Sequence, residues 1–362
     1  MFLKNKKNKF FTVWQAIRKT LIYCMKKDKN IILFGEGIDD GAAMFQTTKG
    51  FLKIFGAKRV FEMPLSENLF IGAAVGASML GDKVIVNLQR VEFALLALEQ
   101  IINNAAKTHY LSNGSLNIPI VIRLVVGRGW GQGPTHSQSL ETLFTSIPGL
   151  KVMMPVFPEE SKNLLFEAIR DPNPVIFIEN RWCHYNFGKL NKKYKSKNSS
   201  VIKLSEGNDL IIFSTGYNTN ETVEILKMLK KYRINISHFH FGILKPLKIR
   251  NLMPKIKKIK KIILLDSGLK EFGFFSEVVS QIYENIEGKE IKHIRIGLPD
   301  HPIPSSKSLT KNVYLTGDII LKNIFKMLKL KKTKQKIIMK DYKNLIKNKI
   351  IDTPNNNFKG PF

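Results

Sequence analysis

Apolar segments of strand length alternate with helix-like segments along most of the chain, and this alternation restricts the possible folds more than any other feature. Strand patterns at residues 30–37 (NIILFGEG), 82–89 (DKVIVNLQ) and 118–127 (IPIVIRLVVG) are separated by helical patterns, among them residues 93–111. Strands that alternate with helices form mostly parallel sheets with helices on both faces. We therefore expect an α/β fold.

A polar and basic stretch after residue 184 divides this alternation into two parts. Such stretches are typical of linkers between domains. We expect a first, parallel-sheet α/β domain over residues 1–190, a linker over residues 191–206 and a smaller α/β domain over residues 207–327. Residues 328–362 are rich in lysine and have a weak apolar pattern, so we interpret them as a basic tail.

The net charge of +29, from 58 Lys and Arg against 29 Asp and Glu, would by itself suggest a nucleic acid or an anionic surface as partner. The basic residues are scattered, however, and aromatic residues are not interleaved with them as stacking on single strands requires. We therefore expect no nucleic-acid partner. Cys24 and Cys183 are too few for a disulfide framework, and no leader or membrane span is recognisable. We expect a cytoplasmic protein without membrane contact.

A single carboxylate stands out at the start of a helix of small residues. Residues 62–81 (EMPLSENLFIGAAVGASMLG) place Glu67 at that start. Because such a helix allows other backbone to approach closely, we expect it to be buried. The residues alone leave two roles open for Glu67, either a charge favoured by the helix dipole or a working acid.

His136, in GPTHSQS, is the best candidate for a functional histidine among the seven in the chain. It follows a glycine-rich loop, and an imidazole titrates near neutral pH. The alternative is a loop histidine with a structural hydrogen bond. We interpret the other six as structural or surface residues: His109, His184, His238, His240, His293 and His301.

Several further motifs occur in a fixed order: GEGIDDGAAMFQTTKG, RVFEMPLSEN, LEQIINNAAKTHYLSNG, THSQSLE, IPGLKVMMP and DPNPVIFIEN. On these motifs, the chain from about Phe11 to Met327 resembles the beta subunit of the thiamin diphosphate-dependent decarboxylating component of 2-oxo acid dehydrogenase complexes, of the pyruvate and branched-chain type. The resemblance implies a transketolase-like pyrimidine-binding domain followed by a transketolase C-terminal-like domain. It also implies decarboxylation of a 2-oxo acid and transfer of the acyl group to a lipoyl domain.

The resemblance assigns roles to four residues. Glu67 matches the glutamate of the P-x-S-E motif that contacts N1′ of the cofactor's aminopyrimidine ring, where a buried carboxyl can share a proton and favour the imino tautomer. Phe93 matches the aromatic residue on which this ring stacks, with a plain core position as the alternative. Glu36 ends a strand at the same crevice and either contacts the cofactor or caps a loop. His136 matches the histidine of H-S-Q that faces the family's active site.

The resemblance also implies partners, because the chain lacks the G-D-G motif that binds Mg²⁺ and the diphosphate in complete thiamin diphosphate enzymes. A separate alpha-type subunit is expected to supply Mg²⁺ and the diphosphate half of the site, in an alpha2beta2 assembly. A lipoyl acyltransferase component is the expected further partner. Asp171 and Asn173, in RDPNP, match a turn that binds K⁺ in the family mainly through backbone carbonyls.

Three positions depart from the family pattern. Ser146 replaces a histidine, Lys248 replaces an acid, and Trp130 is bulky for its glycine-rich loop. A serine cannot supply the positive charge of an imidazolium, so we expect substrate choice or acyl transfer to differ. Two alternatives stay open: a split transketolase-like enzyme that passes the thiamin-bound carbanion to an aldehyde, and a non-catalytic scaffold subunit.

Overall fold

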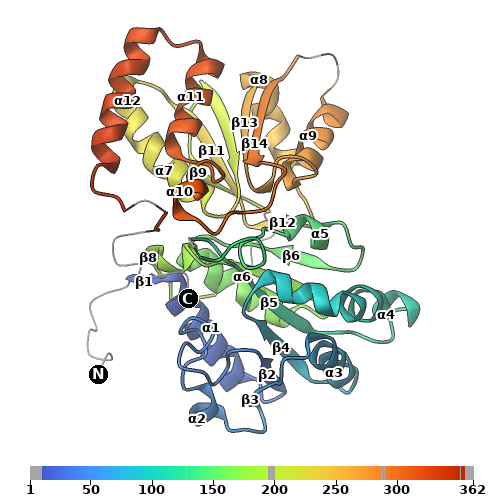
Figure 1. The fold of residues 1–362 in the computed structure, drawn as a ribbon. Helices are drawn as coiled ribbons and strands as arrows, with labels where there is room; N and C mark the ends of the chain where they lie inside the picture. Colours follow the sequence, from blue (N-terminus) through green and yellow to red (C-terminus); the bar gives the residue numbers. More distant parts are fainter. Residues whose placement is uncertain are drawn as a thin grey trace. The chain divides into compact units, whose positions relative to one another are not determined.

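A computed structural model of the chain describes residues 10–129, 131–194, 200–286, 288, 290–350 and 352–354 (Figure 1). The chain forms two compact units, the first from Met1–Val126 and Ser146–Asn198 and the second from Gly127–Thr145 and Ser199–Pro361. The boundary near residue 198 falls inside the predicted linker. In this division Gly127–Thr145 is grouped with the second unit, whereas the predicted first domain is continuous. None of the helices in the described ranges is both long and apolar enough to cross a bilayer.

The first unit is built on a parallel sheet, which confirms the predicted fold class. Its strands run in the order β6-β7-β5-β4-β2-β3, and each neighbouring pair is parallel. The apolar residues that predicted these strands form the core, and Leu33, Val86, Ile122 and Ile176 have no exposed surface. The strands are β2 (Ile31–Gly35), β3 (Val60–Glu62), β4 (Lys83–Leu88), β5 (Ile120–Val126), β6 (Lys151–Met153) and β7 (Val175–Asn180), with a separate antiparallel pair of β1 (Phe10–Thr12) and β8 (Phe187–Lys189).

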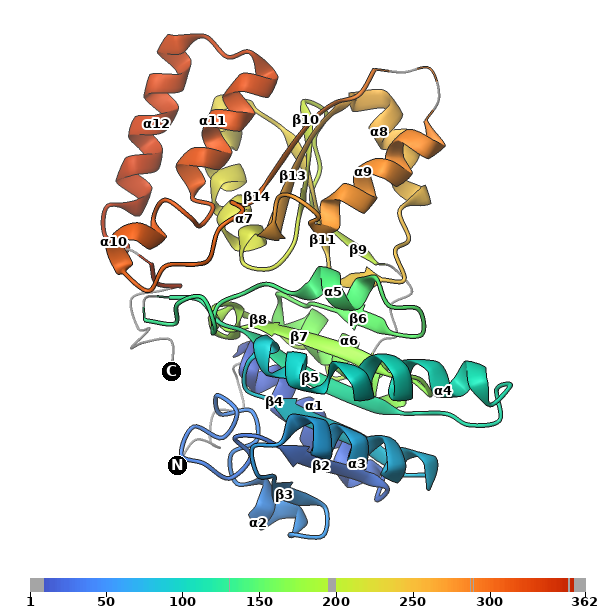
Figure 2. The same ribbon diagram turned by 45° about the vertical axis from the view of Figure 1, so that its right-hand side comes forward.

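Helices cover both faces of this sheet (Figure 2). On one face α1 packs against α6, and on the other α3 packs against β4 and against the helical segments η1 and η2. Thr12 and Gln15 start α1 with a capping box, in which each side chain bonds the backbone N–H of the other residue. The helical segments are α1 (Val13–Lys27), α2 (Phe51–Phe55), α3 (Glu67–Met79), η1 (Val91–Ala97), η2 (Gln100–Ala105), α4 (Ala106–Leu111), α6 (Pro158–Arg170) and η3 (Cys183–Tyr185).

The second unit is also an α/β structure, as predicted. Its sheet has five strands in the order β14-β13-β10-β11-β9. Only β9 is antiparallel to its neighbour. The strands are β9 (Val201–Ser205), β10 (Leu210–Ser214), β11 (Ile236–Phe241), β13 (Lys261–Leu269) and β14 (Lys292–Leu298), and a short β12 (Ile243–Lys245) follows β11. The helical segments are α5 (Glu141–Thr145), α7 (Asn218–Leu229), η4 (Lys230–Tyr232), η5 (Arg250–Leu252), α8 (Met253–Ile259), α9 (Phe274–Asn285), α10 (Lys307–Thr310), α11 (Gly317–Leu328) and α12 (Lys332–Ile346).

Strand β9 shortens the linker that the sequence suggested at residues 191–206. It lies at an edge of the second sheet, and Lys203 in its middle is exposed. An edge strand is half solvated, so it carries polar residues like those of a linker. The composition of residues 201–205 therefore did not distinguish an edge strand from a linker.

The last helix, α12, lies in the segment that the sequence suggested to be a basic tail. Ile338 and Tyr342, one turn apart, are buried in a core that includes Ile225 of α7 and Ile324 of α11. The phenol of Tyr232 donates a hydrogen bond to Asp341 Oδ2 at 2.6 Å. The segment to residue 346 is therefore part of the second unit, and its many lysines obscured the apolar stripe in the sequence.

Candidate functional site

The loop that follows β2 is fixed where the parallel strands of the first unit end. Gly35 has φ of +128°, and a Cβ there would lie 2.2 Å from the carbonyl oxygen of Asn87, so only glycine fits. The carboxylate of Glu62, at the end of β3, accepts hydrogen bonds from the backbone N–H groups of the three residues after Glu36, at 2.8, 2.6 and 3.1 Å. These contacts hold the backbone on both sides of Glu36.

Glu36 and Glu67 form a buried pair of carboxyl groups. They are 2% and 7% exposed, and their side chains lie within hydrogen-bonding reach of each other. The backbone N–H of Gln89 donates to Glu36 Oε2 at 3.3 Å. Burial, together with the negative charges of Glu67 and Glu62, raises the pKa of Glu36 to about 8. The pair therefore holds a proton at neutral pH, which it can share with a group placed beside it.

A Glu36→Gln variant is expected to change how the stability of the chain depends on pH. The pKa of Glu36 rises from 4.5 to about 8 on folding, so its contribution to stability is complete below pH 4.5 and is lost as the pH rises through about 8. Glutamine cannot ionise, so the stability of the variant relative to wild type should rise between about pH 4.5 and about pH 8 and stay level above that. Thermal unfolding followed by circular dichroism measures this difference.

The control for this experiment is Glu99→Gln, a change of the same type at an exposed glutamate of the first unit. Its midpoint of unfolding should run parallel to that of wild type over the same pH range. A Glu36→Gln curve that also ran parallel would show that Glu36 takes up no extra proton on folding.

Helix α3 brings Glu67 to the pair, but only one of its faces is buried. On that face a Cβ at Gly72 would lie 3.3 Å from Gln100 Oε1, so the small residue allows η2 to approach closely. The face includes Phe70, Ile71 and Ala74, which have no exposed surface. The expectation that α3 is buried all round is therefore wrong for this chain alone, because its opposite face, with Asn68, Ala73 and Gly76, is exposed.

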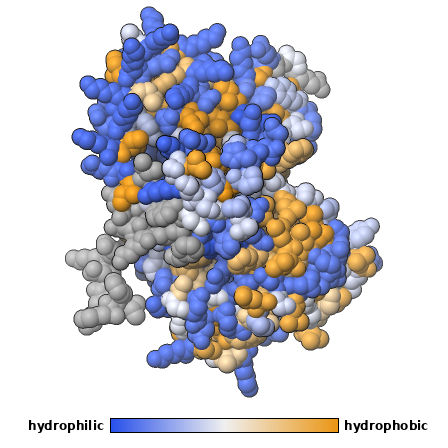
Figure 3. All heavy atoms as spheres, in the orientation of Figure 1, coloured by the Kyte–Doolittle hydropathy of each residue, from blue (hydrophilic) through white to orange (hydrophobic). Residues whose placement is uncertain are grey.

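Exposed apolar side chains lie on α3 and just beyond its two ends, on η1 and at the end of α4. We call this surface the α3–α4 face, and it comprises Leu65, Leu69, Leu80, Leu96, Tyr110 and Leu111. Figure 3 shows hydrophobic side chains, in orange, on the lower right of the first unit, where these elements lie. Single exposed apolar residues are common, but a group of this size is typical of a protein interface.

Phe93 lies on η1, which follows β4 and packs against α3. It is half-buried, and its backbone N–H donates to the carbonyl of Arg90 at 3.3 Å. Phe93 and Glu67 thus lie on neighbouring elements of one unit. Phe93 offers an apolar surface, and the pair of Glu36 and Glu67 offers a buried proton. A flat aromatic base with a ring nitrogen could use both. Apart from Glu67, no described residue is a partner for Glu36 Oε1.

His136 lies on Gly127–Thr145 and therefore in the second unit, whereas Glu36, Glu67 and Phe93 lie in the first. Its Nδ1 is 2.9 Å from the hydroxyl of Thr135, and its side chain is half-buried. A Cβ at Gly127 would lie 2.0 Å from the carbonyl oxygen of His136, so this turn requires glycine. Trp130, which the sequence marked as unusual, lies outside the described residues.

Two side chains hold this segment within the second unit. The guanidinium of Arg128 lies 4.2 Å from the ring centre of Tyr314 and 5.1 Å from that of Tyr217. The carboxylate of Glu141 accepts a hydrogen bond from the hydroxyl of Ser267 at 2.8 Å. The segment that carries His136 thus depends on the second unit for its conformation.

Asp171 and Asn173 form the turn that the sequence suggested as a K⁺ site. The backbone N–H of Asn173 donates to Asp171 Oδ1 at 3.0 Å, and the ammonium of Lys151 forms an ion pair with the other carboxylate oxygen. A cation at this turn would depend on backbone carbonyls, because Lys151 already neutralises the carboxylate. No group of three or more His, Cys, Asp or Glu side chains in the described part of the chain could hold a metal ion.

A buried charge cluster in the first unit was not recognised in the sequence. Arg123 has no exposed surface, and it donates to Glu179 Oε1 at 2.7 Å and to Asn87 Oδ1 at 3.0 Å. His184 Nε2 lies 2.9 Å from the other carboxylate oxygen of Glu179, and burial lowers the pKa of this histidine. Arg123 and Glu179 each interrupt an apolar strand. Opposite charges on two buried strands are the signal that could have predicted the pair.

Comparisons with known proteins assign the chain to a family. The family models of the transketolase pyrimidine binding domain and the transketolase C-terminal domain match residues 10–183 and 199–320. The mitochondrial pyruvate dehydrogenase E1 component subunit beta of Saccharomyces cerevisiae is 30% identical over 335 residues, which cover 91% of this chain and 92% of the relative. The chain belongs to the family of 2-oxo acid dehydrogenase E1 beta subunits. The resemblance inferred from the motifs is confirmed.

Other relatives of this E1 beta subunit have similar identity. The pyruvate dehydrogenase E1 component subunit beta of Rickettsia bellii is 33% identical over 258 residues, covering 71% of this chain and 79% of the relative. The beta subunit of the acetoin:2,6-dichlorophenolindophenol oxidoreductase of Bacillus subtilis is 30% identical over 322 residues, covering 84% and 94%. Relatives with two different named activities thus match this E1 beta subunit about equally well.

Solved structures support the fold of the E1 beta subunit. A split-gene transketolase, described as an inactive beta4 tetramer, has a TM-score of 0.71 and 19% identity, covering 89% of this chain and 99% of that chain. At this identity the likeness supports the two-domain transketolase-like fold and nothing more specific.

Proposed function

We propose that this chain supplies the pyrimidine-binding half of a thiamin diphosphate site and decarboxylates a 2-oxo acid only together with an alpha-type subunit. The observation that carries the proposal is the buried pair of Glu36 and Glu67, with Glu67 on the helix α3 that packs against η1, the segment of Phe93. When bound, thiamin diphosphate supplies an electron sink for the pair of electrons released with CO₂.

The residues of this chain have three tasks in the proposal. Glu67 offers a carboxyl oxygen to the ring nitrogen of the cofactor, and Glu36, whose raised pKa keeps a proton in the pair, supplies that proton. Phe93 offers a flat apolar surface that orients the ring and excludes water. We propose that His136, in the second unit, serves the carboxylate of the substrate and acyl transfer.

The partner half of the site comes from the alpha-type subunit, with Mg²⁺ and the groups that bind the diphosphate. The α3–α4 face supports this part of the proposal, because an exposed apolar surface beside the helix of Glu67 needs a covering partner. We propose an alpha2beta2 assembly that delivers the acyl group to a lipoyl acyltransferase component, with K⁺ at the turn of Asp171 and Asn173.

The test is an activity assay of the two co-expressed subunits with thiamin diphosphate and Mg²⁺. Pyruvate and branched-chain 2-oxo acids are offered as substrates, and acyl transfer to lipoamide, whose disulfide accepts the electron pair, and transfer to an aldehyde are measured in parallel. Consumption of a 2-oxo acid that needs both subunits and lipoamide supports the proposal. Acetoin as the preferred substrate, or an aldehyde as the required acceptor, would replace it with the acyloin or split transketolase-like function. No activity in a complex that binds the cofactor would favour a scaffold role.

A further inference from the structure

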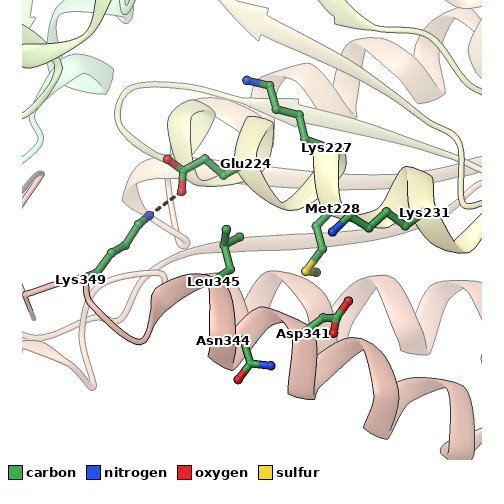
Figure 4. A pocket seen from close by; sticks show the side chains of 8 residues that line it. All are labelled: Glu224, Lys227, Met228, Lys231, Asp341, Asn344, Leu345 and Lys349. Atoms are coloured by element: carbon green, nitrogen blue, oxygen red, sulfur yellow. Dashed lines mark hydrogen bonds and ion pairs between the residues drawn. The ribbon is translucent and has the colours of Figure 1, made fainter.

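A groove of about 570 Å³ runs between α7 and α12 on the surface of the second unit (Figure 4). α7 and the following turn line it with Glu224, Lys227, Met228 and Lys231, a stripe at helical spacing. α12 contributes Leu345, which is 49% exposed. The groove thus lies between two helices and has an apolar floor of Met228 and Leu345.

The acidic residues of this groove already have partners. Glu224 forms an ion pair with Lys349, and Asp341 accepts the hydrogen bond of Tyr232. Lys227 and Lys231 are exposed, and no ion pair is recorded for either within the described ranges. One rim of the groove therefore presents uncompensated positive charge.

The segment that contains α12 is itself strongly basic. Nine of the 22 residues at positions 329–350 are lysine, and Asp341 is the one acidic residue among them. This segment lies beyond residue 320, where the match to the transketolase C-terminal domain ends. One wall of the groove, α12, thus comes from a segment that the domain match does not include, whereas α7 lies within it.

We propose that the α7–α12 groove binds an acidic amphipathic helix of a partner protein. Such a helix would place apolar side chains on Met228 and Leu345 and carboxylates opposite Lys227 and Lys231. A nucleic acid has no apolar stripe to fill this floor. The cations here are lysines, without the planar fork by which arginine binds phosphate in two places.

The probe for this proposal is a fluorescein-labelled synthetic peptide with glutamates on one face of a helix and leucines on the other. Fluorescence anisotropy with the full chain in about 50 mM salt should show binding that weakens as salt is added. A peptide of the same composition, shuffled to remove the apolar stripe, and a duplex DNA of similar charge should bind at least about tenfold more weakly.

Two double variants with reversed charges distinguish binding in the groove from non-specific electrostatic binding to a basic protein. Lys227→Glu with Lys231→Glu should weaken binding of the amphipathic peptide at least about tenfold. Lys257→Glu with Lys258→Glu, at exposed lysines of α8 in the same unit, makes the same change of charge outside the groove and should weaken it less than about twofold. Leu345→Gln, at an exposed position, should weaken binding of the amphipathic peptide but not of the shuffled one.

Three results would overturn the proposal. They are equal weakening by the two pairs of charge reversals, binding of duplex DNA as tight as that of the amphipathic peptide, and no binding of the peptide at low salt. This proposal and the proposed catalytic function can fail independently. The peptide experiment measures binding and not activity, and none of its substitutions lies in the unit that holds Glu36, Glu67 and Phe93.

Discussion

The Glu67→Gln variant, assembled with its alpha-type subunit, is expected to decarboxylate 2-oxo acids roughly 10²–10⁴-fold more slowly than wild type. Glutamine has nearly the size of glutamate, but it cannot take up and release the proton that the pair of Glu36 and Glu67 holds. The loss should appear in kcat, because the ring of the cofactor can still occupy the site. Steady-state kinetics with saturating thiamin diphosphate and Mg²⁺ measures it.

Measurements of cofactor binding and of subunit assembly show whether the variant has lost only proton transfer or also its folded structure. Titration of thiamin diphosphate by fluorescence quenching, and sedimentation of the complex, should give values close to those of wild type. The matched control is Glu284→Gln, at an exposed glutamate of α9, which should keep full activity. Wild-type kcat in Glu67→Gln would exclude Glu67 as the functional acid and leave it the role of a helix N-terminal charge.

The Leu69→Asp variant is expected to weaken association with the alpha-type subunit roughly a thousandfold, which corresponds to about 4 kcal/mol. Leu69 is 58% exposed on the α3–α4 face, so an aspartate there is solvated in the isolated chain and should not disturb its fold. In a complex the same carboxylate would be buried against apolar atoms without a partner. Analytical ultracentrifugation of mixed subunits measures the dissociation constant.

Ile54→Asp is the control for this prediction. Ile54 is an exposed apolar residue of the same unit, but it lies on α2, outside the α3–α4 face. This variant should assemble like wild type. Normal assembly of Leu69→Asp would mean that the alpha-type subunit binds elsewhere on the chain.

The sequence predicted those parts of the fold in which local pattern and tertiary structure agree. Segments 30–37, 82–89 and 118–127 formed strands because each is apolar on both sides, as a sheet with helices on both faces requires. The polar edge strand β9 and the lysine-rich α12 could not be recognised in this way. Their apolar residues are few, and only the neighbouring elements show which side of each is covered.

The site shows the same limit. Glu67 and Glu36 could be singled out by their positions at the start of a helix and at the end of a strand, and the family motif added a role for Glu67. Their contact depends on residues 31 positions apart, and the raised pKa of Glu36 depends first on its burial and then on the nearby charge of Glu67. Arg123 was overlooked, because a charge within an apolar strand is explained only by its partner on another strand.

The path of the chain between the two units has a consequence for its synthesis. A nascent chain that has reached residue 194 contains all the strands and helices of the first unit but none of the residues 200–354 with which Gly127–Thr145 is grouped. At that stage Arg128 lacks Tyr217 and Tyr314, and Glu141 lacks Ser267. The loop of His136 can therefore take its final conformation only after Tyr314 has been synthesised, long after the residues of the carboxyl pair.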